Sequence, residues 1–229
     1  MMGYLKFAPL AALALAGCGD QSDDAAQEGA ETAAASPVDT PTSPSFDCKM
    51  SDGEITDLIC NTPMLARMDN ELQRVYSLAE TGTYASEERL QELTTMQRGW
   101  IGGRDDCWKA TNKLQCVTTS YAQRIHELRQ GFYDSRQEDE KGISNGPLAL
   151  ACDGADFGIS ATFIQADPGV VFLQWLDRSL ALVQVPSGSG ARYEGAWEGQ
   201  ASTLFTKGDD AMFTPPGEAE MTCRIEEIG

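Results

Sequence analysis

A serine and a lysine near the C-terminus, each followed by glycine, are the side chains of this chain best suited to bind another molecule. Ser189 lies in Ser189-Gly190-Ala191-Arg192-Tyr193, and Lys207 lies in Leu204-Phe205-Thr206-Lys207-Gly208-Asp209. A hydroxyl group both donates and accepts hydrogen bonds, and an ammonium group offers three donors and a positive charge. On a chain of formal net charge -18, this pair suits a target whose functional groups are acidic.

The pair is not accompanied by the residues of an ordinary catalytic site. His126 is the only histidine, and Gly188-Ser189-Gly190 lacks the spacing of a nucleophile elbow. The sequence has no Cys-x-x-Cys and no phosphate-binding glycine loop, so it predicts no zinc site and no cofactor. The acidic composition also argues against a nucleic-acid partner. We therefore expect a binding protein and not an enzyme.

The N-terminus resembles a bacterial lipoprotein signal. Lys6 precedes an apolar run over residues 7–16, which ends in Leu15-Ala16-Gly17-Cys18. This run is too short for a transmembrane helix, which needs about 20 residues. The resemblance implies removal of residues 1–17 and acylation of Cys18, with palmitate as a typical chain. Gly19 in place of aspartate favours anchoring in the outer membrane, facing the periplasm. An ordinary secretory peptide is the alternative.

Composition divides the rest of the chain into a tether and two domains. Residues 18–45 are small, polar and acidic, so they cannot bury enough surface to fold and form a disordered tether. Residues 46–138 hold helical patterns, whereas residues 148–229 hold short β-rich runs. Residues 139–147 are polar, end in turn residues and form the predicted linker. The predicted class is α + β multidomain.

Three amphipathic helices are expected in the first domain. Thr62 and Pro63 give a cap and a first-turn proline, and Ser86 caps the second helix. Apolar residues then recur at helical spacing in each of the three segments. They are Leu65, Met68, Leu72, Val75, Tyr76 and Ala79, then Leu90, Leu93, Met96, Trp100 and Ile101, then Leu114, Val117, Tyr121, Ile125, Leu128 and Phe132.

The cysteines divide evenly between the two domains. After Cys18 is used for lipid, six remain, four in the helical part and two in the β-rich part. Six cysteines allow 15 pairings, but the division favours Cys152–Cys223 and pairing of the other four among themselves. We expect Cys48–Cys60 and Cys107–Cys116.

The helical domain resembles the N-terminal domain family of the LprI lysozyme inhibitor. The four cysteines, the Gln-Arg-x-Trp and the Arg-Asp-x-Cys occur in the order of that family over residues 46–130. The resemblance is carried by Phe46-Asp47-Cys48, Ile59-Cys60, Leu65-Ala66-Arg67-Met68-Asp69, Tyr76, Gln97-Arg98-Gly99-Trp100, Arg104-Asp105-Asp106-Cys107 and Tyr121-Ala122-Gln123-Arg124-Ile125. It implies an envelope protein, in which Trp100 and Arg104 either pack and cap the helices or contact a target. The same two interpretations apply to Trp108 and Lys109.

The second domain contains eight short β-rich runs separated by turn signals. Such regular spacing is typical of an antiparallel sandwich or barrel. The runs cover residues 148–152, 157–164, 170–177, 179–185, 191–195, 202–207, 210–214 and 220–225.

This region resembles the family of membrane-bound inhibitors of c-type lysozyme, over residues 149–225. The resemblance is carried by Ala151-Cys152-Asp153, Ser189-Gly190-Ala191-Arg192-Tyr193, Phe205-Thr206-Lys207-Gly208-Asp209-Asp210-Ala211 and Thr222-Cys223. It implies a small eight-stranded antiparallel barrel after a disulfide-linked three-helix domain.

By position, Ser189 and Lys207 match the serine and lysine with which that family reaches the two catalytic carboxyl groups of lysozyme. Gly190, Arg192, Tyr193 and Gly208 are expected to support the two loops. The segment between Ser189 and Lys207 is longer than in the family, with the extra residues expected within 194–202, and Leu204 stands where the family prefers an aromatic residue.

The resulting functional hypothesis is an envelope lipoprotein that inserts two barrel loops into the active site of c-type lysozyme and so protects peptidoglycan. From residue 148 onward, the chain has twelve acidic residues and four basic ones, which gives a net charge of -8. The basic residues are Arg178, Arg192, Lys207 and Arg224. C-type lysozymes are basic, so opposite charges would speed encounter. The alternative is a general envelope adaptor, whose helical domain binds peptidoglycan or another envelope protein.

Overall fold

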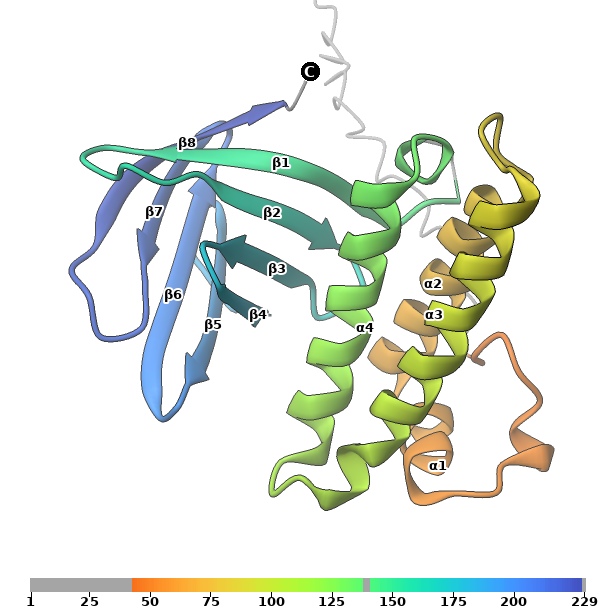
Figure 1. Cartoon of the computed structure of the whole chain (residues 1–229). Helices are drawn as coiled ribbons and strands as arrows, with labels where there is room; N and C mark the ends of the chain where they lie inside the picture. The colour runs from red at the N-terminus through yellow and green to blue at the C-terminus, as the bar shows by residue number, and fades with distance from the viewer. Residues whose placement is uncertain (1–42, 138–140, 228–229) are drawn as a thin grey trace, which may run out of the picture. The chain divides into compact units, whose positions relative to one another are not determined.

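The computed structural model describes residues 43–137 and 141–227, which belong to one compact unit. The first part is helical (Figure 1). Ser86 and Asn112 cap their helices by accepting hydrogen bonds from the Arg89 and Gln115 N–H groups. The elements are η1 (Cys48–Met50), α1 (Glu54–Asn61), α2 (Pro63–Thr81), α3 (Glu87–Asp105), η2 (Asp106–Lys109), α4 (Lys113–Gly131) and η3 (Asp134–Arg136).

The helical part has one α-helix more than the three that were predicted. Helices α2, α3 and α4 cover the three predicted segments, and α1 is the addition. α1 has eight residues, too few for a recurring apolar period, and it buries Ile55 and Ile59, one turn apart. Its end is attached to η1 by the Cys48–Cys60 disulfide.

The second part is a closed barrel of eight antiparallel strands in chain order (Figure 1). Each strand pairs with its neighbours in sequence, and β1 pairs with β8 to close the barrel. This confirms the predicted fold class. The strands are β1 (Ser144–Cys152), β2 (Ile159–Ile164), β3 (Val170–Trp175), β4 (Arg178–Val185), β5 (Ala191–Trp197), β6 (Gln200–Lys207), β7 (Asp210–Thr214) and β8 (Met221–Glu227).

Strand β1 begins at Ser144, within the residues assigned to the linker from the sequence. Its early part pairs with the end of β2, as Ser144 lies opposite Ile164, and the register then shifts between Asn145 and Leu148. Gly146 occupies this bulge with a φ of 120°. Because of the bulge, apolar and polar residues do not alternate regularly here, so the start of β1 could not be predicted from the sequence pattern.

The barrel interior is filled by side chains from all eight strands. Trp175 and Phe213 meet edge to face, with ring centroids 5.5 Å apart. Leu204 is fully buried in this core, at the position where an aromatic residue was expected. The buried members are Leu150, Ile159, Ala161, Val171, Leu173, Trp175, Leu180, Leu182, Tyr193, Leu204, Ala211, Phe213 and Cys223.

The outer wall of β1–β4 is covered by helix α4, so the helical part and the barrel share a second core. Helix α4 contacts α2 and α3 on one side and β1–β4 on the other. Phe172 and Ala181 point outward from the barrel and are buried in the helical core, together with Ile164 and Val170. The ring of His126 lies against Phe172, with centroids 5.0 Å apart. The two domains therefore pack directly on each other.

Buried charged side chains fasten the start of β1 to the helices. The carboxylate of Glu71 accepts hydrogen bonds from the main-chain N–H groups of Ile143 and Ser144, at 3.2 Å each, and from the Ser144 hydroxyl. Arg129 donates through Nε to the carbonyl of Gly146 at 2.6 Å. Because both side chains are almost fully buried, these bonds fix the entry of the chain into the barrel.

Three disulfides join the pairs expected from the sequence, Cys48–Cys60, Cys107–Cys116 and Cys152–Cys223. The last links the end of β1 to β8, where Cys152 and Cys223 are paired in register.

The predicted signal peptide, the lipidated Cys18 and most of the tether lie outside the described residues. Within 43–137 and 141–227, no helix is long and apolar enough to cross a membrane.

Candidate functional site

The strand order places Ser189 and Lys207 at the same end of the barrel. Ser189 lies in the β4–β5 loop (186–190), and Lys207 is the last residue of β6, directly before the turn into β7. In an antiparallel barrel, alternate connections lie at the same end. Ala191, the first residue of β5, pairs with Thr206, so the Ser189 loop ends beside the last residues of β6.

Gly190 allows the Ser189 loop to lie directly on β6. Its φ is 71°, in the left-handed region that favours glycine. A Cβ atom at this position would lie 2.4 Å from the carbonyl oxygen of Thr206 and 2.9 Å from Cζ of Phe205. Any side chain here would push the loop away from β6. Glycine therefore sets the position of Ser189 relative to the end that carries Lys207.

Lys207 is exposed at the start of a tight turn. It pairs with Asp210 across this turn, and Gly208 adopts a φ of 61°. Among the described residues, no carboxylate lies within ion-pair distance of the Lys207 ammonium and no hydrogen bond occupies it. Ser189 is also exposed, and its hydroxyl has no partner within the same residues. Both groups are free to bind an external acceptor.

Arg192 and Tyr193, the other expected support residues, lie on opposite faces of β5. The Arg192 Nε atom donates to Glu194 Oε1 at 2.7 Å, an exposed pair on the outer face. Tyr193 faces the interior and packs edge to face on Phe163 at 5.9 Å. Burial raises the pKa of Tyr193 above its ordinary value. Tyr193 thus holds β5 through its packing in the barrel core, whereas Arg192 forms an ion pair with Glu194 on the same strand.

The longer segment between Ser189 and Lys207 forms a regular hairpin. β5 and β6 stay paired from Ala191–Thr206 to Trp197–Gln200, joined by a two-residue turn. Glu198 and Gly199 have φ values of 50° and 80°, as in a type I′ turn. The segment assigned the extra residues lies toward this turn, at the barrel end opposite Ser189 and Lys207. The additional residues therefore extend the paired part of β5 and β6.

An open hollow of about 550 Å³ occupies the barrel mouth at the Ser189 end. Its floor includes the Phe163 and Tyr193 rings, and the Gln184 side chain accepts a hydrogen bond from Gly169 N–H at 3.3 Å. This hollow is not predictable from local sequence patterns, because its residues come from four strands and one loop. The lining residues are Asn145, Phe163, Ile164, Gln165, Asp167, Gly169, Gln184 and Tyr193.

In the helical part, the residues that carry the LprI resemblance form an internal network. The Tyr121 hydroxyl donates to Asp69 at 2.8 Å and accepts from Arg104 Nη1 at 3.1 Å. Burial and the Asp69 carboxylate raise the pKa of Tyr121 well above its ordinary value. Trp100 packs edge to face on Tyr121 at 5.2 Å, and its Nε1 donates to the carbonyl of Ser120. These contacts agree with a packing role for Trp100 and Arg104.

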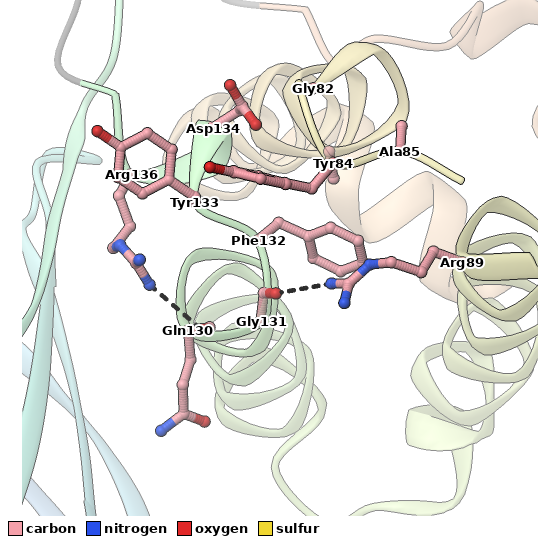
Figure 2. A pocket seen from close by; sticks show the side chains of 11 residues that line it. Gly82, Tyr84, Ala85, Arg89, Gln130, Gly131, Phe132, Tyr133, Asp134 and Arg136 are labelled. Atoms are coloured by element: carbon pink, nitrogen blue, oxygen red, sulfur yellow. Dashed lines mark hydrogen bonds between the residues drawn. The ribbon is translucent and has the colours of Figure 1, made fainter.

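A hollow of about 220 Å³ lies where α2 ends and α4 ends (Figure 2). Tyr84 and Tyr133 are exposed at its edge. Its two arginines are used for structure, since Arg89 donates to the carbonyl of Gly131, and Arg136 donates to that of Gln130 (Figure 2). Cations at these carbonyls stabilise the C-terminal end of α4. We therefore assign this hollow to helix capping.

Within the described residues, no group of histidine, cysteine, aspartate and glutamate side chains has the arrangement of a metal site. His126 is buried between α4 and the barrel, where it contacts Thr162 and Gln174. At the Ser189 end, the exposed Lys207 ammonium and Ser189 hydroxyl can donate hydrogen bonds, and Lys207 adds a positive charge.

Two family descriptions match the two parts of the chain. Residues 48–128 match "Lysozyme inhibitor LprI", and residues 151–222 match "Membrane-bound lysozyme-inhibitor of c-type lysozyme". No solved structure matches the chain significantly.

Relatives named lipoprotein LprI, from Mycobacterium bovis and Mycobacterium tuberculosis, are 30% identical to the chain over 166 residues. The alignment covers 70% of this chain and 78% of each relative, and so includes most of both proteins. The chain therefore belongs to the family of the lipoprotein LprI, with an LprI-type helical part followed by a barrel of the c-type lysozyme inhibitor family.

Proposed function

We propose that this protein is an envelope lipoprotein that inhibits c-type lysozyme by inserting the Ser189 and Lys207 loops of its barrel into the active-site cleft. Both matched family descriptions name lysozyme inhibitors, and the relatives are named lipoproteins. The observation that carries the proposed mechanism is the presence of an unpaired ammonium and an exposed hydroxyl at one barrel end.

The chemistry of the target fits these two groups. Lysozyme cleaves its substrate with two carboxyl groups, one protonated and one ionised, on either side of the scissile bond. The Lys207 ammonium supplies donors and a positive charge to the ionised group. The Ser189 hydroxyl donates to one carboxyl group and accepts from the other. Hydrogen bonds to charged groups contribute about 1.5–3 kcal/mol each.

The anchor is the second part of the proposal. Cys18 carries the lipid after residues 1–17 are removed, and the tether holds the folded part at the outer membrane, facing the periplasm. Labelling with a radioactive fatty acid tests this directly. The intact chain should incorporate label, and Cys18→Ser should not.

The inhibition experiment requires the helical part and the barrel together. Removing the helices would expose Phe172, Ala181 and Ile164 on the outer wall of the barrel. A loss of inhibition by the isolated barrel could then result from misfolding or aggregation and would not test the loops. The assay is lysis of a cell-wall suspension by c-type lysozyme, with the intact chain, Lys207→Ala and Ser189→Ala. Arg178→Ala is the matched control, because Arg178 is an exposed cation at the start of β4, at the barrel end opposite Ser189 and Lys207.

We expect near-stoichiometric inhibition by the intact chain and by Arg178→Ala. Lys207→Ala should weaken inhibition by about one to two decades, as expected for one lost charge-assisted hydrogen bond. Full inhibition by Lys207→Ala would contradict loop insertion. Absence of inhibition by the intact chain, together with sedimentation on cell-wall sacculi, would favour the envelope adaptor.

A further inference from the structure

One end of the helical part displays an apolar surface that the internal network does not use. This surface, the disulfide tip, consists of the end of α3, η2, the first turn of α4 and the facing side of α1. Trp108 is 56% exposed, Leu114 43% and Ile101 40%. We propose that the disulfide tip is a second binding surface for c-type lysozyme, with Trp108 as its anchor. This inference rests on the proposed function.

The main chain next to Trp108 is constrained by a disulfide. Its neighbour Cys107 is buried and bonded to Cys116 on α4, which ties η2 to the start of that helix. The Lys109 ammonium lies 5.5 Å from the centre of the Trp108 ring and 2.6 Å from Oδ1 of Asp106. An anchor ordered before binding loses little conformational entropy in the complex. Tryptophan is also enriched among the residues that dominate interface energies.

A shallow hollow of about 280 Å³ lies at the same end, between α1 and the first turn of α4. Leu58 and Leu114 provide its apolar lining, and Glu54 and Asp57 provide carboxylates at its edge. Glu54 is paired with Lys113 at 2.5 Å, and Asp57 accepts a hydrogen bond from the Ser51 hydroxyl. Because Lys113 also lines the hollow, two carboxylates and one ammonium give its edge a net negative charge, which complements a basic protein such as lysozyme.

The position of the disulfide tip makes it independent of the barrel loops. Trp108 lies in η2, which connects α3 to α4 at the bottom of Figure 1, whereas β6, which Lys207 ends, runs to the top of the same view. Effects of substitutions at two separate surfaces are expected to add in free energy. Loss of Trp108 should therefore weaken lysozyme binding by the same factor with or without Lys207.

The test measures the affinity of the full chain, purified in detergent, for c-type lysozyme by titration calorimetry. Trp108→Ala should weaken binding about tenfold or more. Tyr84→Ala is the matched control, because Tyr84 is an exposed aromatic residue at the opposite end of the helical part, and it should bind as the unchanged chain does. Trp108→Phe should retain part of the lost affinity.

Lys207→Ala separates this inference from the proposed function. If Lys207→Ala weakens binding and Trp108→Ala does not, the disulfide tip is not a lysozyme surface. If Trp108→Ala weakens binding and Lys207→Ala does not, the disulfide tip stands and loop insertion fails. If the unchanged chain does not bind lysozyme, both fail. Hydrogen exchange gives a readout without substitution, since lysozyme should slow exchange over residues 106–116, and unchanged exchange there would overturn the inference.

Discussion

The Nδ1 atom of His126 lies 2.8 Å from Oγ1 of Thr162, which joins helix α4 to the outer wall of the barrel. Its Nε2 atom lies 3.2 Å from Oε1 of Gln174. A neutral imidazole satisfies both contacts, because Nε2–H donates to Gln174 while Nδ1 accepts from the Thr162 hydroxyl. Burial lowers the pKa of His126 below its ordinary value of 6.5, although the Gln174 contact and the Glu127 carboxylate oppose the shift. Protonation of His126 therefore places a positive charge in the core between α4 and the barrel, which destabilises the folded state.

We predict that acid weakens the packing of α4 on the barrel through His126. Because the folded pKa is depressed, its contribution to stability is present above about pH 6.5 and is lost as the pH falls toward the folded pKa. Each unit of depression corresponds to about 1.4 kcal/mol. Thermal unfolding at pH 7.5 and pH 5 measures this loss. The midpoint should fall less in His126→Gln than in the unchanged chain, and equal falls would contradict the prediction.

Glu71 is predicted to be the residue whose loss most damages the junction before β1. Its carboxylate accepts from the N–H groups of Ile143 and Ser144 and pairs with Arg74 at 2.7 Å. Glu71→Ala leaves buried donors unpaired, at a cost of about 3–5 kcal/mol. Glu71→Gln keeps the shape and one acceptor oxygen, so it should cost less. Urea unfolding followed by circular dichroism compares the two. Equal stability of Glu71→Ala and the unchanged chain would show that the network is dispensable.

The elements were predictable where a local pattern fixes them. Thr62-Pro63 and Ser86 mark the starts of α2 and α3, and turn residues separate the eight strands near their observed bounds. The packing of α4 on the barrel was not inferred, although a signal was present. Val170-Val171-Phe172-Leu173 is apolar at every position, as in a strand covered on both faces. A strand with one face in solvent would instead alternate apolar and polar residues.

The site was predictable only in part, because it combines local and distant features. Ser189 and Lys207 are read from their motifs, and their common barrel end follows from the antiparallel order. The mouth hollow combines Asn145 and Phe163, which are paired across β1 and β2, with Gln184 of β4, which reaches the same mouth because the sheet curves into a barrel. The role of Trp108 depends on its exposure, and a helical pattern cannot distinguish an exposed tryptophan from a packed one.

Gly190→Ala is predicted to displace the Ser189 loop without unfolding the barrel. The new Cβ would lie 2.4 Å from the Thr206 carbonyl, at a φ that disfavours alanine. Strain of this kind costs about 1–3 kcal/mol, and the loop should relieve it by moving. Gly158→Ala is the matched control, since a Cβ there meets no atom within 4 Å and Gly158 lies between β1 and β2, at the opposite barrel end. Lysozyme inhibition should fall for Gly190→Ala and stay constant for Gly158→Ala. Equal inhibition by both would contradict the proposed loop position.

The Cys152–Cys223 disulfide is predicted to stabilise the barrel more than either helical disulfide stabilises its part. Its cysteines are 71 residues apart in sequence, against 12 and 9 for the other two. In the chain-entropy model, a loop of this length contributes about 4 kcal/mol. Chemical unfolding of Cys152→Ala/Cys223→Ala and Cys48→Ala/Cys60→Ala compares the effects. A larger loss in the second variant would contradict the model.

Shortening the β5–β6 hairpin is predicted to leave inhibition intact. Deleting Ala196, Trp197, Gln200 and Ala201 removes two opposed pairs and keeps the Glu198–Gly199 turn. Gly195 would then pair with Ser202 directly before the turn, as it does now before the deleted pairs.

Because Trp197 packs against the barrel core, the shortened protein should lose stability. It should still inhibit lysozyme at 25 °C with the affinity of the unchanged chain, since the Ser189 and Lys207 loops lie at the other barrel end. Titration of the lytic assay measures this. A folded shortened variant that no longer inhibits would show that the hairpin tip contacts lysozyme, and that the binding surface extends to the opposite end of the barrel.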